Sequence, residues 1–210
     1  MQWRNLDDKY PPWQSVYYYF RKWQKNKTWD KILSKLVQLE RVLNDRPPEP
    51  SYVAIDSQST KIGSLIHLEI GVDGNKKIKG RKRHIAVDTL GLPIAIHVSA
   101  ANKHDGKEGK ELLWQLDKAS KRLTSISVDG TYKGEFEDNA TIYGWEVTIT
   151  QKPPSEKGFV PQKGRWQVER SFGWFNFYRR LSRDFEKTVE SSVAFIQLAF
   201  ISIILARLGN

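Results

Sequence analysis

Residues 84–100 read HIAVDTLGLPIAIHVSA, two apolar stretches on either side of a turn at Asp88 to Gly91. Apolar and β-branched residues fill both stretches, and Asp and Gly are residues that tight turns favour, so the segment predicts a β-hairpin. Three further segments have the composition of strands, namely YVAID (52–56), SISVD (125–129) and WEVTIT (145–150).

Helical patterns alternate with these strands. Three segments are predicted to be helical: one that begins at Asp105, the stretch RWQVERSFGWFNFYRRL (165–181), and the apolar run 193–208. The order of strand, hairpin, helix, strand, helical connection, strand and helix predicts an α/β fold with a mixed sheet covered by helices.

Composition limits the kinds of protein this can be. The chain has 210 residues, a formal net charge of +10 and no cysteine, which excludes disulfides and thiolate metal sites. The N-terminus lacks a secretory signal, and the run 193–208 is shorter than the ~20 residues a bilayer crossing needs, so we expect a buried helix and a cytoplasmic protein. The positive charge favours nucleic acid as partner, with a merely basic surface as the alternative.

A proline-rich stretch divides the chain. NDRPPEPSY (44–52) contains three prolines, which cannot continue a helix. The pattern before it predicts two helices joined by a short turn within 11–43. The expected organisation is a small, helix-turn-helix-like DNA-binding region at 1–45, a linker at 46–52 and an α/β domain at 53–210.

Two of the predicted strands end on a carboxylate, Asp56 and Asp129. Ligands gather at the carboxyl ends of strands in open α/β sheets, so both acids can share one crevice, where they repel each other unless a cation lies between them. Mg²⁺ prefers carboxylate oxygens, and a two-ion site for phosphodiester chemistry needs one more acid, for which Glu169 is the candidate. The alternative is that these acids end strands or form turns, as expected for Asp73 and Asp88.

The remaining polar residues suggest simpler roles. Asp105 is a candidate helix N-cap. The histidines lack the spacing of zinc ligands.

Two groups of cations are candidates for contact with the DNA backbone. KKIKGRKRH (76–84) contains a glycine that interrupts any helix, so we expect an exposed loop or strand edge; a solvated charge run is the alternative. The first group comprises Lys76, Lys77, Lys79, Arg81, Lys82 and Arg83. The second surrounds Glu169 and comprises Lys163, Arg165, Arg170, Arg179 and Arg180, which we interpret as phosphate clamps rather than as ion-pair partners.

Four stretches, taken together and in order, resemble bacterial insertion-sequence transposases with a DDE, RNase H-like catalytic domain. They are YVAIDSQSTKIG, KKIKGRKRHIAVDTLGLPIAIHVSAANKHDGK, SVDGTYKG and GRWQVERSFGWFNFYRRLSRDFEK. The resemblance implies that 53–210 has the RNase H-like fold and that Asp56, Asp129 and Glu169 are the catalytic residues, holding two Mg²⁺ or Mn²⁺ ions. It also implies cutting at element ends, joining of the 3′-hydroxyl to target DNA, a homodimer on double-stranded DNA in the nucleoid, and no small-molecule cofactor.

The chain departs from the family pattern in two respects. The pattern has a Tyr seven residues before the Glu, an Arg four before it and a Lys seven after it; Arg165 matches, whereas Gln162 and Asn176 replace the other two. Relatives usually carry a further N-terminal segment, which leaves two alternatives: a complete, active transposase, or a truncated or frameshifted product. The alternative functions are a catalytically impaired DNA-binding product and a DNA nuclease of the same fold.

Overall fold

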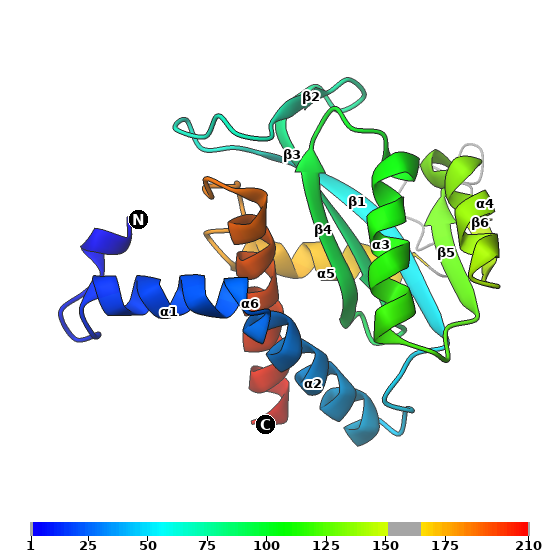
Figure 1. The fold of residues 1–210 in the computed structure, drawn as a ribbon, viewed down its shortest axis with the longest axis horizontal. Helices are drawn as coiled ribbons and strands as arrows, with labels where there is room; N and C mark the ends of the chain where they lie inside the picture. The colour runs from blue at the N-terminus through cyan, green and yellow to red at the C-terminus, as the bar shows by residue number, and fades with distance from the viewer. Residues whose placement is uncertain (1, 151–164, 210) are drawn as a thin grey trace.

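The computed structural model describes residues 2–150 and 165–209, which form a mixed sheet flanked by helices (Figure 1). The strands are β1 (Tyr52–Lys61), β2 (Gly71–Asp73), β3 (Ile78–Val87), β4 (Pro93–Ala100), β5 (Ser125–Asp129) and β6 (Glu146–Thr150). The α-helices are α1 (Trp13–Lys25), α2 (Thr28–Leu43), α3 (Asp105–Ala119), α4 (Glu135–Ile142), α5 (Trp166–Trp174) and α6 (Val189–Leu208). Short 3₁₀ helices are η1 (Trp3–Asn5), η2 (Gly130–Tyr132) and η3 (Phe175–Phe177).

The sheet combines antiparallel and parallel pairing. Its order is β2-β3-β1-β5-β6, with β4 also paired to β3. β3 is antiparallel to β1 and β4, whereas β5 runs parallel to both β1 and β6. This topology, with helices on both faces, confirms the predicted α/β, RNase H-like fold.

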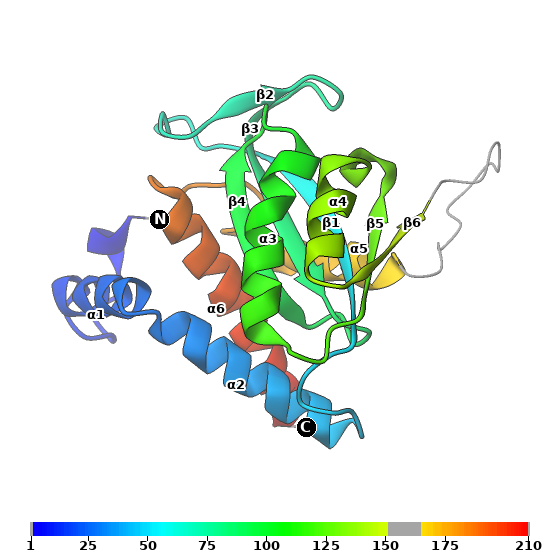
Figure 2. The same ribbon diagram turned by 45° about the vertical axis from the view of Figure 1, so that its right-hand side comes forward.

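Strand alternation separates the core into two layers. In β1, Val53 and Ile55 pack with α3 and α4, whereas Ala54 faces the layer that contains α2, α5 and α6. Successive side chains of a strand point to opposite faces, which explains this division. Figure 2 shows α3 and α4 on one side of the sheet and α6 on the other.

The hairpin that the sequence predicts is confirmed as β3–β4. Asp88 begins its turn, and the Oδ1 atom of Asp88 accepts the N–H groups of Leu90 at 2.9 Å and Leu92 at 2.8 Å. Gly91 adopts a φ of +75°, a conformation that glycine tolerates best. The predicted turn role of Asp88 is therefore confirmed, and Asp88 also pairs with Arg41 of α2.

Two predicted element boundaries were wrong. β1 does not end at Asp56 but continues to Lys61, because β3 pairs with it along the whole length from Ala54. The helix expected over 165–181 stops at Trp174 and passes into η3.

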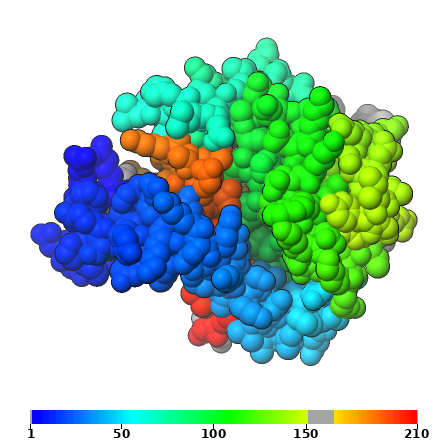
Figure 3. All heavy atoms as spheres, viewed as in Figure 1, coloured from blue at the N-terminus to red at the C-terminus, as the bar shows by residue number. Residues whose placement is uncertain are grey.

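α6 closes the second layer of the core. By length and composition alone it could cross a membrane, but 44% of its apolar window is buried inside the molecule. Ile196, Phe200 and Ile204 pack with Leu33 and Val37 of α2. Figure 3 shows α1 extending away from this packed body.

Candidate active site

Asp56 and Asp129 lie on neighbouring parallel strands and on the same face of the sheet. β1 and β5 pair in a register that aligns Ala54 with Ser127, so continuing it by two residues brings Asp56 alongside Asp129. Asp56 is also directly opposite Ile85 of β3, whose side chain packs on the face that carries α5. The structure therefore brings these two predicted residues together, in front of α5.

Asp56 makes an ion pair with Arg165 inside the site. The Nη2 atom of Arg165 donates to Oδ2 of Asp56 at 2.8 Å, and the two side chains are only 10% and 14% exposed. The N–H of Ser57 donates to the other oxygen, Oδ1, at 2.7 Å. Burial raises the pKa of Asp56 above its usual value, and the nearby charge of Asp129 adds to the rise, while Arg165 and Ser57 oppose it.

Arg165 experiences the charge of all three predicted catalytic acids. Burial alone would lower the pKa of Arg165, but the charge and hydrogen bond of Asp56, followed by the charges of Asp129 and Glu169, raise it above its usual value. The prediction that Arg165 is not an ion-pair partner is therefore wrong, whereas its role as a phosphate clamp stays a prediction.

Glu169 lies in the first turn of α5. Val168 and Phe172 are 0% and 7% exposed and fix this helix against the sheet, and the hydroxyl of Ser171 donates to the carbonyl of Gly91 at 2.9 Å. The N–H of Glu169 donates to the carbonyl of Arg165 at 3.1 Å. A carboxylate near a helix N-terminus is stabilised by the unpaired N–H groups there.

Asp129 ends β5 and caps η2. Its Oδ1 atom accepts the N–H of Thr131 at 2.9 Å and also a hydrogen bond from the Thr131 hydroxyl. The strand-end position predicted for Asp129 is confirmed, and the residue also has the turn role given as the alternative.

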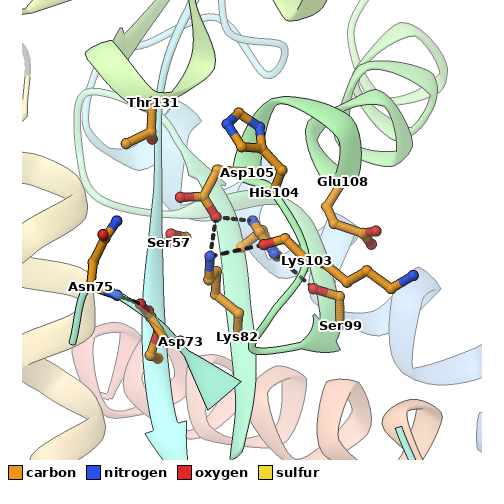
Figure 4. Close-up of polar contacts among 12 residues, drawn as sticks. Ser57, Asp73, Asn75, Lys82, Ser99, Lys103, His104, Asp105, Glu108 and Thr131 are labelled. Atoms are coloured by element: carbon orange, nitrogen blue, oxygen red, sulfur yellow. Dashed lines mark hydrogen bonds and ion pairs between the residues drawn. The ribbon is translucent and has the colours of Figure 1, made fainter. Parts of the chain in front are cut away.

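A second polar cluster lies on the opposite face of the sheet, against α3 (Figure 4). The Nζ atom of Lys82 lies 2.8 Å from Oδ1 of Asp105 and donates to the carbonyl of Lys103 at 3.0 Å. Asp105 is the first residue of α3, and the N-cap is His104, whose Nδ1 accepts the N–H of Gly106. The prediction of Asp105 as the N-cap was therefore wrong by one residue.

His84 connects this cluster to the elements that carry the two aspartates. The Nδ1 atom of His84 is 3.4 Å from the hydroxyl of Tyr132, which follows Asp129 in η2, and Nε2 is 3.1 Å from the hydroxyl of Ser99. Burial lowers the pKa of His84 to about 3, helped by the nearby His97 and Lys82. Burial raises the pKa of Tyr132, and Ser57, the neighbour of Asp56, is near enough to oppose that rise.

Sequence reasoning missed this cluster, although alternation along β3 contains a signal for it. Lys82, His84 and Ala86 occupy every second position of β3, so their side chains lie on the same face of the sheet. Ala86 packs on the face that α3 covers. Arg81 and Arg83 alternate with them and therefore face α5 and α6.

The prediction that residues 76–83 form one exposed basic segment was wrong for Arg81, Lys82 and Arg83. These side chains belong to β3 and are 0%, 8% and 1% exposed. Arg81 donates to the backbone carbonyl of Glu186, and its Nη1 atom lies 3.4 Å from Oδ2 of Asp184. Arg83 donates to the backbone carbonyl of Leu181. These cations therefore have partners inside the fold, as buried charges require. Burial also lowers the pKa of Arg83 to about 10.

The other predicted DNA-binding residues have different surroundings. Lys76, Lys77 and Lys79 are exposed, as is Arg179. Arg170 donates to the carbonyl of Leu90 at 2.8 Å and stacks on Trp166 and Trp174. Arg180 pairs with Glu186 at 2.7 Å, and Lys163 and Gln162 lie outside the described residues.

The donor set matches a hard divalent cation only in part. Carboxylate oxygens are the ligands that Mg²⁺ prefers, and Asp56 and Asp129 supply them from adjacent strands. Within 2–150 and 165–209, no three Asp, Glu, His or Cys side chains are close enough to hold an ion together. The carboxylate oxygens therefore suit a divalent cation, but Oδ2 of Asp56 is already hydrogen-bonded to the guanidinium of Arg165.

A large groove lies away from these acids. It has a volume of about 1020 Å³, and α1, α2, α3, β4 and the start of α6 line it. Because Asp56, Asp129 and Glu169 do not line it, we place the candidate active site at the carboxylates rather than in the groove.

Comparison with known proteins identifies related families. Residues 47–205 match the family model "Transposase DDE domain", and residues 1–33 match "Putative transposase of IS4/5 family". A "Putative transposase for insertion sequence element IS402" from Burkholderia cepacia is 28% identical over 126 residues, covering 57% of this chain and 60% of that protein. The chain therefore spans less than two thirds of that relative.

One solved structure is similar at low identity. It is a chain of the simian T-cell lymphotropic virus intasome in complex with PP2A regulatory subunit B56 gamma, with a TM-score of 0.46 and 16% identity. The similarity covers 74% of this chain and 49% of that one.

Proposed function

The chain belongs to the transposase DDE domain family, and from this premise we propose that it cuts phosphodiester bonds at insertion-sequence ends and joins the 3′-hydroxyl to target DNA. The observation that carries the proposal is the placement of Asp56 and Asp129 on adjacent parallel strands, with the α5 helix of Glu169 packed against the same face. The charges of Asp56, Asp129 and Glu169 all act on Arg165, which supports a site built by acids from three distant parts of the sequence.

Asp56, Asp129 and Glu169 are the proposed ligands of divalent cations, Mg²⁺ or Mn²⁺, with two ions expected. When bound, such ions activate an attacking oxygen and stabilise the leaving one. Glu169 would close the site from α5, whose position is fixed by the burial of Val168 and Phe172.

The proposed reaction has two balanced steps. In the first, water attacks a phosphodiester at the element end, one P–O bond breaks, and the products are a 3′-hydroxyl and a 5′-phosphate. In the second, that 3′-hydroxyl attacks a target phosphodiester, so one P–O bond forms as another breaks. The carboxylates would hold the divalent cations, which in turn would bind the scissile phosphate that the acids alone repel. The exposed Lys76, Lys77 and Lys79 are proposed to bind flanking phosphates without reading sequence.

We further propose that the working form is a homodimer on double-stranded DNA, bound to element ends and target, in the bacterial cytoplasm. The family match and the net charge of +10 support DNA as the partner.

The test is metal-dependent nicking of a duplex that carries an element end. Glu169→Gln should bind this duplex as the parent does but lose nicking by at least about a hundredfold, as expected when a group that acts in the transition state is removed. The matched control is Glu111→Gln, an identical change at an exposed position of α3, which should nick at the parental rate.

The outcomes separate the alternatives. Nicking by Glu169→Gln equal to the parent would reject the assignment of Glu169. Nicking without joining to an added target plasmid identifies a nuclease, and salt-sensitive binding without nicking by the parent in Mg²⁺ or Mn²⁺ identifies a non-catalytic DNA-binding protein.

A further inference from the structure

Arg165 is positioned as a cation within the proposed metal site. Its Nη2 atom donates to Oδ2 of Asp56 at 2.8 Å, while Oδ1 already accepts the N–H of Ser57. Both oxygens of Asp56 are therefore engaged, and one is engaged by a positive charge. A divalent ion that used Oδ2 would have to replace that guanidinium.

The same arginine is attached to the helix that carries Glu169. Arg165 is the N-cap residue of α5, and its carbonyl accepts the N–H groups of Val168 at 3.0 Å and Glu169 at 3.1 Å. Its backbone is therefore held, while its side chain, with four rotatable bonds, can exchange partners. The charges of Asp129 and Glu169 also act on the guanidinium, so it neutralises part of the charge that a metal ion would neutralise.

We propose that Arg165 is a displaceable counter-ion of the active site: it holds Asp56 in the metal-free protein and leaves when a divalent ion binds, which frees its guanidinium for a DNA phosphate. The inference rests on the proposed function insofar as Asp56 is taken as a metal ligand. Guanidinium suits both roles, because its planar fork matches carboxylate and phosphate oxygens alike. Metal binding and DNA binding then become coupled, because each favours the state in which the Arg165 guanidinium has left Asp56.

The first test measures metal affinity without DNA and without turnover. Free Mn²⁺ is quantified by electron paramagnetic resonance at pH 8. Arg165→Gln should bind Mn²⁺ roughly tenfold more tightly than the parent, as expected when a charge-assisted hydrogen bond no longer competes. Arg165→Lys, which keeps the charge but loses the fork, should lie between the two.

The matched control is Arg46→Gln, which removes the same charge from an exposed side chain outside the predicted DNA-binding groups. Its Mn²⁺ affinity should equal that of the parent, so that a general change in net charge is separated from a local one. Circular dichroism confirms that each variant is folded. Equal or weaker Mn²⁺ binding by a folded Arg165→Gln would overturn the proposal.

The second test measures the parent protein itself and uses a variant only to assign the signal. In ¹⁵N spectra of the parent, the Arg165 guanidinium, identified by its loss in Arg165→Lys, should exchange slowly with solvent when metal is absent. Adding Mg²⁺ should abolish that protection. Protection that persists at saturating Mg²⁺ would show a fixed structural ion pair and reject displacement.

The two proposals fail in different ways. Nicking that depends on Glu169, together with Mn²⁺ affinity that is unchanged in Arg165→Gln, rejects only the counter-ion role. Mn²⁺ binding that tightens in Arg165→Gln, together with absence of nicking, upholds the counter-ion role and rejects the catalytic proposal.

Discussion

His84 couples the protonation of one buried residue to the stability of the fold. Burial lowers its pKa to about 3, whereas an unfolded histidine titrates near 6.5. Between these values the unfolded chain binds a proton that the folded chain does not. The stability associated with neutral His84 is therefore complete above about pH 6.5 and is lost as the pH falls towards 3.

We expect His84→Gln to reduce this pH dependence. In the parent, His84 should contribute a loss of up to about 1.4 kcal/mol in the free energy of unfolding for each pH unit between 6 and 4. Urea unfolding over this range should show a shallower slope for His84→Gln, whatever its absolute stability. The raised pKa values of Asp56 and Glu186 act in the opposite direction in both proteins, so the difference between the slopes isolates His84.

The control is His67→Gln, because His67 is exposed and its substitution should leave the slope unchanged. A His84→Gln slope equal to that of the parent would contradict the assignment of His84 as neutral in the folded protein.

At the scale of elements, the contact of α3 with η2 and α4 determines where Tyr132 lies. A Cβ atom added at Gly109 of α3 would come within 2.6 Å of the Phe136 ring and 3.2 Å of the Tyr132 ring. Both rings are fully buried, so neither can turn into solvent. The absence of a side chain at Gly109 therefore allows α3 to approach the segment that follows Asp129.

Gly109→Ala should lower the free energy of unfolding by about 1–3 kcal/mol, the usual cost of overpacking a core. The matched substitution is Gly173→Ala in α5, where a Cβ would meet nothing within 4 Å. That change should be neutral or raise stability by up to about 1 kcal/mol, because alanine is the better helix former. Thermal or urea unfolding distinguishes the two; equal effects would contradict the packing argument.

The predictability of each element depended on whether its pattern is local. The hairpin and α3 were predicted because their turn residues and periodicity lie within the segment itself. The extent of β1 was not, because pairing with β3 continues the strand beyond Asp56. The proximity of Asp56 and Asp129 was predictable, because each ends a similar apolar stretch in the sequence. The pairing of Arg165 with Asp56 was not, because it depends on contacts between segments that are far apart in the chain.

At the scale of the whole molecule, the net charge of +10 overstates the number of cations available at the surface. Four cations are buried and face partners inside the protein, namely Arg81, Lys82, Arg83 and Arg165. Attraction of the surface for a polyanion must therefore come from exposed cations. Examples are Lys76, Lys77 and Lys79, which lie at the start of β3 and in the segment just before it.

Replacing the three exposed lysines of this segment with alanine should weaken DNA binding and its salt dependence. The slope of log affinity against log salt should become shallower by roughly 0.9 for each DNA phosphate that the variant no longer neutralises. Fluorescence anisotropy from low to moderate salt gives this slope. The variant combines changes at Lys76, Lys77 and Lys79; the control of equal charge combines Lys9, Lys118 and Lys121, also exposed. Equal slopes for the two triple variants would reject this surface as the site of DNA binding.

The order of the elements along the chain also has a consequence for protein synthesis. Asp56 gains its neighbour Asp129 only when β5 has been made, and α5 packs on a core that Phe200 and Ile204 of the final helix complete. Domains fold as units while the ribosome extends the chain from its N-terminus. In a nascent chain the proposed DNA-cleaving site therefore stays incomplete until α6 emerges, so we expect the growing polypeptide to lack the proposed activity.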